Sequence, residues 1–237
     1  MFFKFRVFVI DFYFIPMRIL FIGNSHTYLH YMPQLLTGLA RLKGRTVITE
    51  QSIGEGAGLA WHWKRSEARD LIEKGRWTHV VLQERSRGAL EDRASMHGHA
   101  LRFNKVIRDS GARTVFFMTW AARGKNRDQT VISKTYQDIA QACGAMLAPV
   151  GRAWESTLAQ PACENLFHRD GRHAGKAGAY LTACVFYALI CKDNPIGLSG
   201  IVEREGKILA NLKEEQALLL QEAARDAVGE QADSDVS

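Results

Sequence analysis

Short apolar runs alternate with longer helical patterns from Met17 onward, and this alternation constrains the fold more than any other feature of the sequence. It is typical of a parallel β-sheet wrapped by helices. We predict strands over residues 18–22, 46–50, 79–83, 114–119 and 145–148. Helices are predicted over 33–42, 59–73, 94–110, 129–141 and 174–190. The expected fold class is α/β, a three-layer α/β/α sandwich with a five-stranded parallel sheet.

Length and composition are compatible with one domain of this kind. The chain has 237 residues, of which 46% are hydrophobic and 24% charged, close to the average of globular proteins. We predict one domain over 17–228, whose last amphipathic helix covers 209–228, and a flexible acidic tail over 229–237. The formal net charge of +6 is modest, so we expect a soluble enzyme and no nucleic-acid partner.

The first sixteen residues differ from the rest and are rich in phenylalanine. Asp11 interrupts their apolar run, no small-residue cleavage site follows, and the run is too short to span a bilayer. We therefore expect no stable membrane insertion. Met17 begins MRILFIGNS, a natural first strand, so we predict that translation starts there and that 1–16 is an upstream extension. A membrane-associated or exported N-terminus is the alternative.

Four cysteines bear on the compartment and on metal binding. Cys143, Cys163, Cys184 and Cys191 form no C-x-x-C pair and have no zinc-finger spacing. We interpret them as reduced structural thiols. Reduced thiols are compatible with a cytoplasmic location, which we predict for this chain.

The strand-to-helix loops are the expected place for a ligand. Right-handed crossovers bring the loops that follow parallel strands to one edge of the sheet, and ligands bind at this edge. The loops expected to converge there are 23–28, 51–58, 84–93, 120–128 and 168–173.

The first of these loops carries a serine just after the predicted first strand. Ser25 lies within Gly23-Asn24-Ser25-His26-Thr27, at the start of a helix whose backbone N–H groups can hold an anion. Serine and threonine also commonly cap helices, and for this segment in isolation we favour the interpretation that Ser25 or Thr27 is a cap.

The last loop carries an aspartate and a histidine three residues apart. In Asp170-Gly171-Arg172-His173 the carboxylate can accept the Nδ1 proton of His173 and stabilise the imidazolium. A helix-capping aspartate beside a surface histidine is the simpler alternative. A metal site would combine His168, Asp170 and His173, but no H-E-x-x-H run supports one, so we expect no metal.

Four ordered sequence blocks carry a family resemblance over about 175 residues, from Met17 to Cys191. They are ILFIGNS at 19–25, VVLQERS at 80–86, DGRH at 170–173 and GAYL at 178–181. Together they resemble the GDSL-like, or SGNH, hydrolase superfamily, and within it the branch with GNS, V-V-L-Q-E-x-S and D-G-x-H blocks. The resemblance implies the flavodoxin-like SGNH hydrolase fold and a serine hydrolase that acts on ester bonds without a cofactor.

The resemblance also implies roles for individual residues. Ser25 would be the nucleophile, His173 its general base and Asp170 the group that orients the base. The backbone N–H of Ser25 and that of a glycine in the second block would stabilise the oxyanion. We choose Gly56 for this glycine, and Gly54 is its rival.

Where the superfamily's third block has Gly-x-Asn, this chain has Gln83-Glu84-Arg85-Ser86. We predict that the side-chain amide of Gln83 replaces the missing asparagine as an oxyanion donor. The alternative is that Gln83 only ties down a neighbouring loop through backbone hydrogen bonds.

Further residues are candidates for the walls of a substrate pocket. Trp120 follows a predicted strand and is a candidate wall residue. His26 could shape the acyl pocket, although we favour an ordinary helix-start residue. Trp61, His62 and Trp63 are expected to pack against the sheet. The ten lysines and arginines between residues 85 and 127 could favour an anionic substrate, but we interpret them as a solvated face.

From these observations we predict a serine esterase that hydrolyses a small ester through an acyl-Ser25 intermediate. An O-acetyl group on a carbohydrate is the expected substrate. An O-acyltransferase with the same Ser-His-Asp site is the nearest alternative. A non-catalytic flavodoxin-like binding domain is less favoured, because residues 23–27 contain neither G-x-G-x-x-G nor a P-loop lysine.

Overall fold

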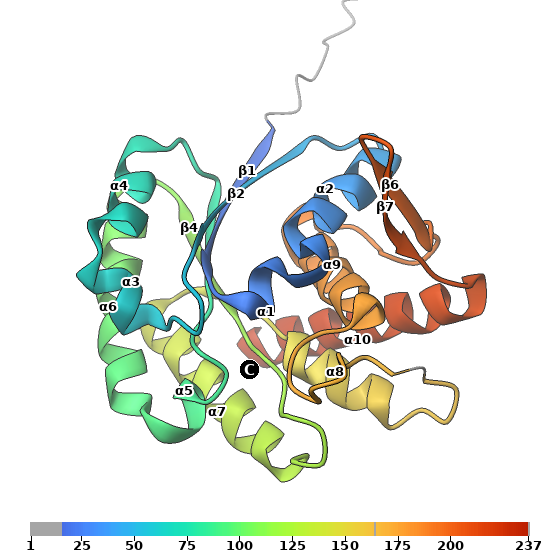
Figure 1. Cartoon of the computed structure of the whole chain (residues 1–237). Helices are drawn as coiled ribbons and strands as arrows, with labels where there is room; N and C mark the ends of the chain where they lie inside the picture. Colours follow the sequence, from blue (N-terminus) through green and yellow to red (C-terminus); the bar gives the residue numbers. More distant parts are fainter. Residues whose placement is uncertain (1–15, 164, 237) are drawn as a thin grey trace, which may run out of the picture.

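A five-stranded parallel sheet lies at the centre of the computed structural model, which describes residues 16–163 and 165–236 (Figure 1). The strand order is β2-β1-β3-β4-β5, and every neighbouring pair is parallel. The strands are β1 (Met17–Gly23), β2 (Val47–Ile53), β3 (His79–Leu82), β4 (Arg113–Phe117) and β5 (Met146–Ala148). The predicted fold class and all five predicted strands are confirmed, with shifts of a few residues at the ends.

Helices cover both faces of this sheet (Figure 1). One face carries α2 (Met32–Leu42), α8 (Val150–Leu158), α9 (Lys176–Cys191) and α10 (Glu214–Val236). The other carries α3 (Leu59–Lys64), α4 (Ser66–Lys74), α5 (Gly88–Glu91), α6 (Arg93–Asp109) and α7 (Arg127–Cys143). Because both faces are covered, β1, β3 and β4 are mostly buried apolar runs, whereas the edge strand β2 is partly exposed and carries polar residues. Successive residues of β1 illustrate this, since Ile19 belongs to one core and Leu20 to the other.

Three features differ from the predicted elements. The helix predicted over 59–73 is interrupted at Arg65, whose extended backbone separates α3 from α4. Helix α8 was not predicted. A hairpin of β6 (Ile201–Arg204) and β7 (Lys207–Asn211) occupies the predicted start of the last helix. Its turn places Glu205 and Gly206 at positive φ, a turn conformation suited to hairpins. Helix α10 therefore begins at Glu214, and it extends through most of the acidic segment expected to be a tail.

The predicted N-terminal extension lies outside the described residues, except for Pro16. Within residues 16–163 and 165–236, no helix is both long and apolar enough to cross a membrane. The thiols of Cys143, Cys184 and Cys191 are buried.

Strand order places the candidate site. The chain leaves β1 for β2 on one side and later adds β3 on the other side, so the order switches at β1. Ligands bind beyond the carboxyl ends of strands at such a switch. Short helix α1 (Ser25–Tyr28) starts directly after β1 at this edge.

Candidate active site

Asn24, rather than Ser25, caps helix α1. Its backbone is extended, with φ −138° and ψ −152°, and its side-chain Oδ1 accepts the N–H of His26 at 3.0 Å. The cap leaves the hydroxyl of Ser25 available, so Ser25 is the first residue of the helix and not its cap.

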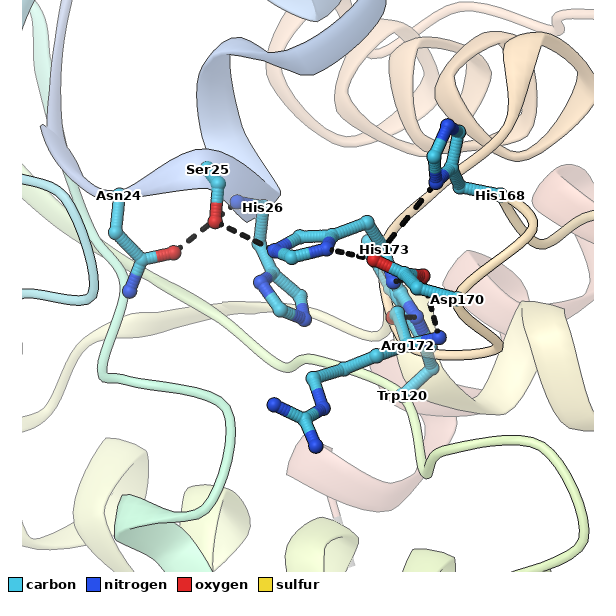
Figure 2. Close-up of polar contacts among 8 residues, drawn as sticks. All are labelled: Asn24, Ser25, His26, Trp120, His168, Asp170, Arg172 and His173. Carbon is cyan, nitrogen blue, oxygen red and sulfur yellow. Dashed lines mark hydrogen bonds and ion pairs between the residues drawn. The ribbon is translucent and has the colours of Figure 1, made fainter.

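The hydroxyl of Ser25 instead faces His173, 148 positions later in the chain (Figure 2). Ser25 Oγ lies 2.8 Å from His173 Nε2, and His173 Nδ1 lies 2.5 Å from Asp170 Oδ2. The structure therefore brings the predicted serine, histidine and aspartate into one hydrogen-bonded chain. In this order the carboxylate keeps the proton on Nδ1 and leaves Nε2 free to accept the serine proton.

A tight turn holds the carboxylate of Asp170 in place. Gly171 has a φ of +68°, which favours glycine, and Asp170 Oδ1 accepts the backbone N–H groups of Arg172 at 2.9 Å and His173 at 3.0 Å. Burial by itself raises the pKa of Asp170, but the hydrogen bonds from His173 and the turn outweigh it and hold this pKa well below its usual range. The carboxylate is thus ionised at neutral pH.

His168 lies close to the same turn, but it is not part of the hydrogen-bonded series formed by Ser25, His173 and Asp170. Its Nδ1 is 3.7 Å from Asp170 Oδ2, and the imidazole of His173 presents Nδ1 to that carboxylate and Nε2 to Ser25. Within the described part of the chain, no group of three histidine, cysteine or acidic side chains could hold a metal ion.

Ser25 and Gly56 line one cavity, and among the described residues neither backbone N–H has an acceptor. Ser25 begins α1, where backbone N–H groups have no intrahelical acceptor. The N–H of Gly56 also donates to no acceptor among the described residues, whereas that of Gly54 donates to the carbonyl of Gly23 at 3.1 Å. Gly56 lines a cavity of about 570 Å³, the catalytic cavity, together with Ser25 and His173. This geometry favours Gly56 over Gly54 as an oxyanion donor.

The structure contradicts the predicted role of Gln83. Its side chain is fully buried; Oε1 accepts the N–H of Asn24 at 2.9 Å and the hydroxyl of Thr27 at 3.0 Å. Its Nε2 donates to the carbonyl of Glu84. The amide of Gln83 thus binds the backbone and side chains of the loop that carries Ser25 and does not point into the cavity. This arrangement agrees with the alternative interpretation, in which Gln83 fixes a neighbouring loop.

Other buried groups that position the site were not identified from the sequence. Asn24 Nδ2 donates to the carbonyl of Ala57 at 2.7 Å. This bond joins the loop that carries Ser25 (the serine loop, residues 23–28) to the glycine-rich loop that follows β2 (the glycine loop, residues 54–58). The imidazole of His62 donates to the carbonyl of Gly23 at 2.9 Å. A Cβ on Gly23 would lie only 2.5 Å from Gln83 Oε1, so this position requires glycine. Their partners are distant in sequence, so no local pattern indicates them.

The carboxylate of Glu84 binds the backbone at the end of the glycine loop and at its own neighbour, Arg85. Its Oε2 accepts the N–H of Leu59 and its Oε1 that of Arg85, both at 3.0 Å. Burial raises the pKa of Glu84, against these hydrogen bonds. A Cβ on Gly58 would lie 2.0 Å from this carboxylate, which explains the glycine there.

His26 and Trp120 form one wall of the site (Figure 2). Trp120 is stacked on Trp154 with ring centroids 3.9 Å apart, and the His26 ring lies 4.9 Å from Trp120 and 5.3 Å from His173. His26 is only 4% exposed, and burial lowers its pKa to about 3, so its ring is neutral. His26 therefore lies buried in the wall of the catalytic cavity, at the start of α1.

The tryptophans after β2 are placed largely as expected. His62 is buried, and Trp63 packs edge-on against Phe103. Trp61 is exposed and lines a neighbouring cavity, which differs from the expected packing against the sheet.

Comparison with known proteins identifies the fold. No protein-family model and no curated protein matches the sequence. Among solved structures, a protein provisionally described as an SGNH hydrolase, from Slackia heliotrinireducens, is 26% identical. It matches with a TM-score of 0.62 over 74% of this chain and 99% of its own. This chain has the SGNH hydrolase fold.

Other SGNH-like neighbours show how far the similarity extends. A DUF4886 family protein from Bacteroides uniformis has a TM-score of 0.76 at 18% identity, over 90% of this chain and 95% of its own. An acetyl-xylooligosaccharide esterase from Geobacillus has a TM-score of 0.58 at 15% identity, over 79% of this chain and 97% of its own. Identities this low show the fold alone, so the chemistry has to be argued from the site.

Proposed function

We propose that this SGNH-fold protein is a serine esterase that hydrolyses a small ester through an acyl-Ser25 intermediate. The observation that carries the proposal is the hydrogen-bonded chain from Ser25 through His173 to Asp170, at the open carboxyl edge of the sheet. A serine hydroxyl is a weak nucleophile until a neighbouring base removes its proton, and this geometry supplies that base.

The reaction proceeds in two steps. His173 Nε2 accepts the proton of Ser25 as Oγ attacks the ester carbon, and the backbone N–H groups of Ser25 and Gly56 stabilise the oxyanion. The imidazolium, stabilised by the carboxylate of Asp170, then protonates the leaving alcohol as its C–O bond breaks. In the second step His173 deprotonates a water molecule, which attacks the acyl carbon. The imidazolium then returns this proton to Ser25 Oγ as the acyl C–O bond breaks, which releases the carboxylic acid.

For the substrate we propose an O-acetylated carbohydrate. The catalytic cavity is lined by polar and charged residues such as Glu55, Arg85 and Arg172, which suit a polyol better than a long acyl chain. The acetyl-xylooligosaccharide esterase that shares the fold acts on an ester of this class.

Covalent labelling with a fluorophosphonate tests the nucleophile directly. We predict one adduct, on Ser25, and Ser25→Ala should abolish labelling and lower turnover of a short-chain nitrophenyl ester by several orders of magnitude. Ser86 also lines the catalytic cavity, so Ser86→Ala, which should still be labelled, is the matched control.

An adduct on any other residue, or a folded Ser25→Ala protein that retains more than about a tenth of the activity, would refute the proposal. Circular dichroism shows whether the variants are folded. Adding a sugar acceptor distinguishes hydrolysis from acyl transfer, since an acyltransferase would form the new ester in preference to free acetate.

A further inference from the structure

A second cavity, of about 400 Å³, adjoins the catalytic cavity. His26, Ser86, Arg87 and Arg172 line both. Trp120 and the turn that carries Asp170 form further parts of its wall. A ligand bound at Ser25 can therefore extend into this second cavity without leaving the protein surface.

The wall of the second cavity is strongly basic. Two aspartates and five cationic residues line it. The aspartates are Asp128 and Asp170, and the cationic residues are Arg87, Arg123, Lys125, Arg169 and Arg172. The carboxylate of Asp170 is already bound to His173 and to its own turn. We call this cavity the basic recess.

Only part of this positive charge is compensated by the protein. Arg87 pairs with Glu91, and Arg123 donates to Asn165 Oδ1 at 2.8 Å. The side chains of Lys125, Arg169 and Arg172 form no hydrogen bond or ion pair with residues 16–163 or 165–236. A basic cavity with three uncompensated cations attracts anions.

Arg172 is the best placed of these three cations. Its backbone N–H donates to Asp170 Oδ1 at 2.9 Å, and its carbonyl accepts from Trp120 Nε1 at 3.0 Å. Its main chain is thus held on both sides. From this fixed point its side chain extends past the His26 ring, and its guanidinium contacts none of the other residues drawn in Figure 2.

His26 adds an independent observation. Although the residue is only 4% exposed, neither ring nitrogen has a hydrogen-bond partner in the described part of the chain. Both nitrogens are also closed off from the two cavities, so His26 contributes a neutral aromatic ring to the shared wall, and the charge of the recess comes from its arginines and its lysine.

The recess lies beside the turn that precedes the general base, His173. The leaving oxygen must lie beside His173 Nε2 to receive its proton, and residues 169–172 of the recess directly precede His173. Gly56, which we assign to the oxyanion, lines the catalytic cavity but not the recess.

We propose, on the basis of the proposed esterase function, that the basic recess binds an anionic group on the alcohol part of the ester. The substrate class is then an ester of an acid-bearing alcohol, such as an acetylated sugar acid. Arginine suits this role because its planar fork forms paired, charge-assisted hydrogen bonds with a carboxylate. Arg87, Arg123 and Lys125 come from the basic segment that we interpreted from the sequence as a solvated face.

Two acetate esters that differ in one charge test the proposal. The anionic probe is 4-acetoxybenzoate, and the neutral probe is its methyl ester. Arg172→Gln should lower the ratio of kcat/KM for the anionic probe to that for the neutral probe by about 10- to 100-fold. Arg172→Lys, which keeps the charge but loses the fork, should lower the ratio less.

A matched control removes the same charge elsewhere. Arg108 is exposed near the end of α6, just before β4 begins, and so lies at the opposite edge of the sheet. Arg108→Gln should leave the ratio unchanged. In the wild type, added salt should lower the ratio, because salt screens the attraction between exposed charges.

A second pair of probes places the charge on the acyl side instead, with 4-nitrophenyl hemisuccinate compared with 4-nitrophenyl butyrate. If Arg172→Gln lowers this ratio rather than the first, the assignment to the alcohol part is wrong. Protection of Ser25 from a fluorophosphonate by 4-hydroxybenzoate measures binding without turnover, and Arg172→Gln should weaken that protection about tenfold or more.

The outcomes separate this proposal from the function on which it rests. If both acetate esters are hydrolysed and neither the ratio nor the protection depends on Arg172 in a folded variant, the recess proposal fails and the esterase remains. If Ser25 is not labelled and neither ester is hydrolysed, both proposals fail.

Discussion

At the scale of single residues, Asp170 combines two tasks that ordinarily need separate groups. One carboxylate oxygen holds the turn through two backbone N–H groups, and the other holds His173. Asp170→Asn therefore disturbs the orientation and the stabilisation of the imidazolium, whereas His173→Ala deletes the base. We predict that both variants lose activity by orders of magnitude, with the larger loss in His173→Ala.

Turnover of a short-chain ester by each variant, and by each combined with Ser25→Ala, checks this prediction. The losses should not add, because the three residues act as one unit. Losses that multiply across the three positions would contradict it.

The pH profile belongs to the same scale. Only a neutral imidazole accepts the serine proton, so kcat/KM should rise with pH as the neutral form of the base becomes more abundant. The neighbouring His26 should add no second step above about pH 3, since burial lowers its pKa to about 3. A profile that depends on two ionisations near neutrality would contradict the assignment of a single base.

A substitution of Gln83 distinguishes a structural role of this residue from a role as an oxyanion donor. Gln83→Ala removes two acceptor contacts and one donor contact from a buried site. It should lower the free energy of unfolding by about 2 kcal/mol or more, and turnover should fall with it, because the serine loop loses its anchor. Denaturant unfolding and kinetics on the same sample check this. Reduced turnover with unchanged stability would instead restore Gln83 to the oxyanion site.

At the scale of elements, α9 carries the last sequence block against the loop that bears Asp170. A Cβ on Gly178 would lie 2.5 Å from the carbonyl of Leu166 and 2.5 Å from the Trp154 ring. Gly178→Ala must therefore displace α9 or that loop. We predict a destabilisation of about 1–3 kcal/mol and a reduced turnover.

Gly98 provides the matched control on another helix. It lies within α6, and a Cβ there would have no neighbour within 4 Å. Gly98→Ala should stabilise the protein by up to about 1 kcal/mol, because alanine favours helix and no contact opposes it. Thermal unfolding of the two variants should show shifts of opposite sign. Equal shifts would mean that helix propensity alone determines both.

At the scale of the whole molecule, buried histidines make the fold sensitive to acid. Burial, with Arg113 and Lys192 nearby, lowers the pKa of His79 from 6.5 to about 4. The unfolded state therefore binds protons more readily, and stability falls as the pH falls from about 6.5 towards 4. For His79 this loss is about 2 kcal/mol between pH 7 and pH 5.

Denaturant unfolding at pH 8, 7 and 5 measures this effect. The wild type should change little between pH 8 and 7, and His79→Gln should lose less stability between pH 7 and 5 than the wild type does. A variant with the same pH dependence as the wild type would exclude His79 as a contributor.

The fold was largely predictable because its signals are local. Strands buried on both faces require short apolar runs, and such runs can be recognised at each of the five positions. The hairpin at 201–211 was missed because residues 209–211 were interpreted as the start of the last helix, and the largely exposed residues 201–208 lack the apolar run of a buried strand. The cytoplasmic location and the start at Met17 remain predictions.

The sequence by itself determined the α/β class, the five strands, the serine after the first strand and the aspartate and histidine before the helix that begins at Lys176, because burial and backbone propensity act over a few residues. Only the tertiary structure favours Gly56 over Gly54, turns the amide of Gln83 away from the cavity and places Arg172 in the wall of the cavity that Ser25 lines. Each of these depends on which donor meets which acceptor between loops distant in sequence. The spacing of residues along the chain does not determine these donor–acceptor pairs. They are determined by how the loops pack against one another at the edge of the sheet.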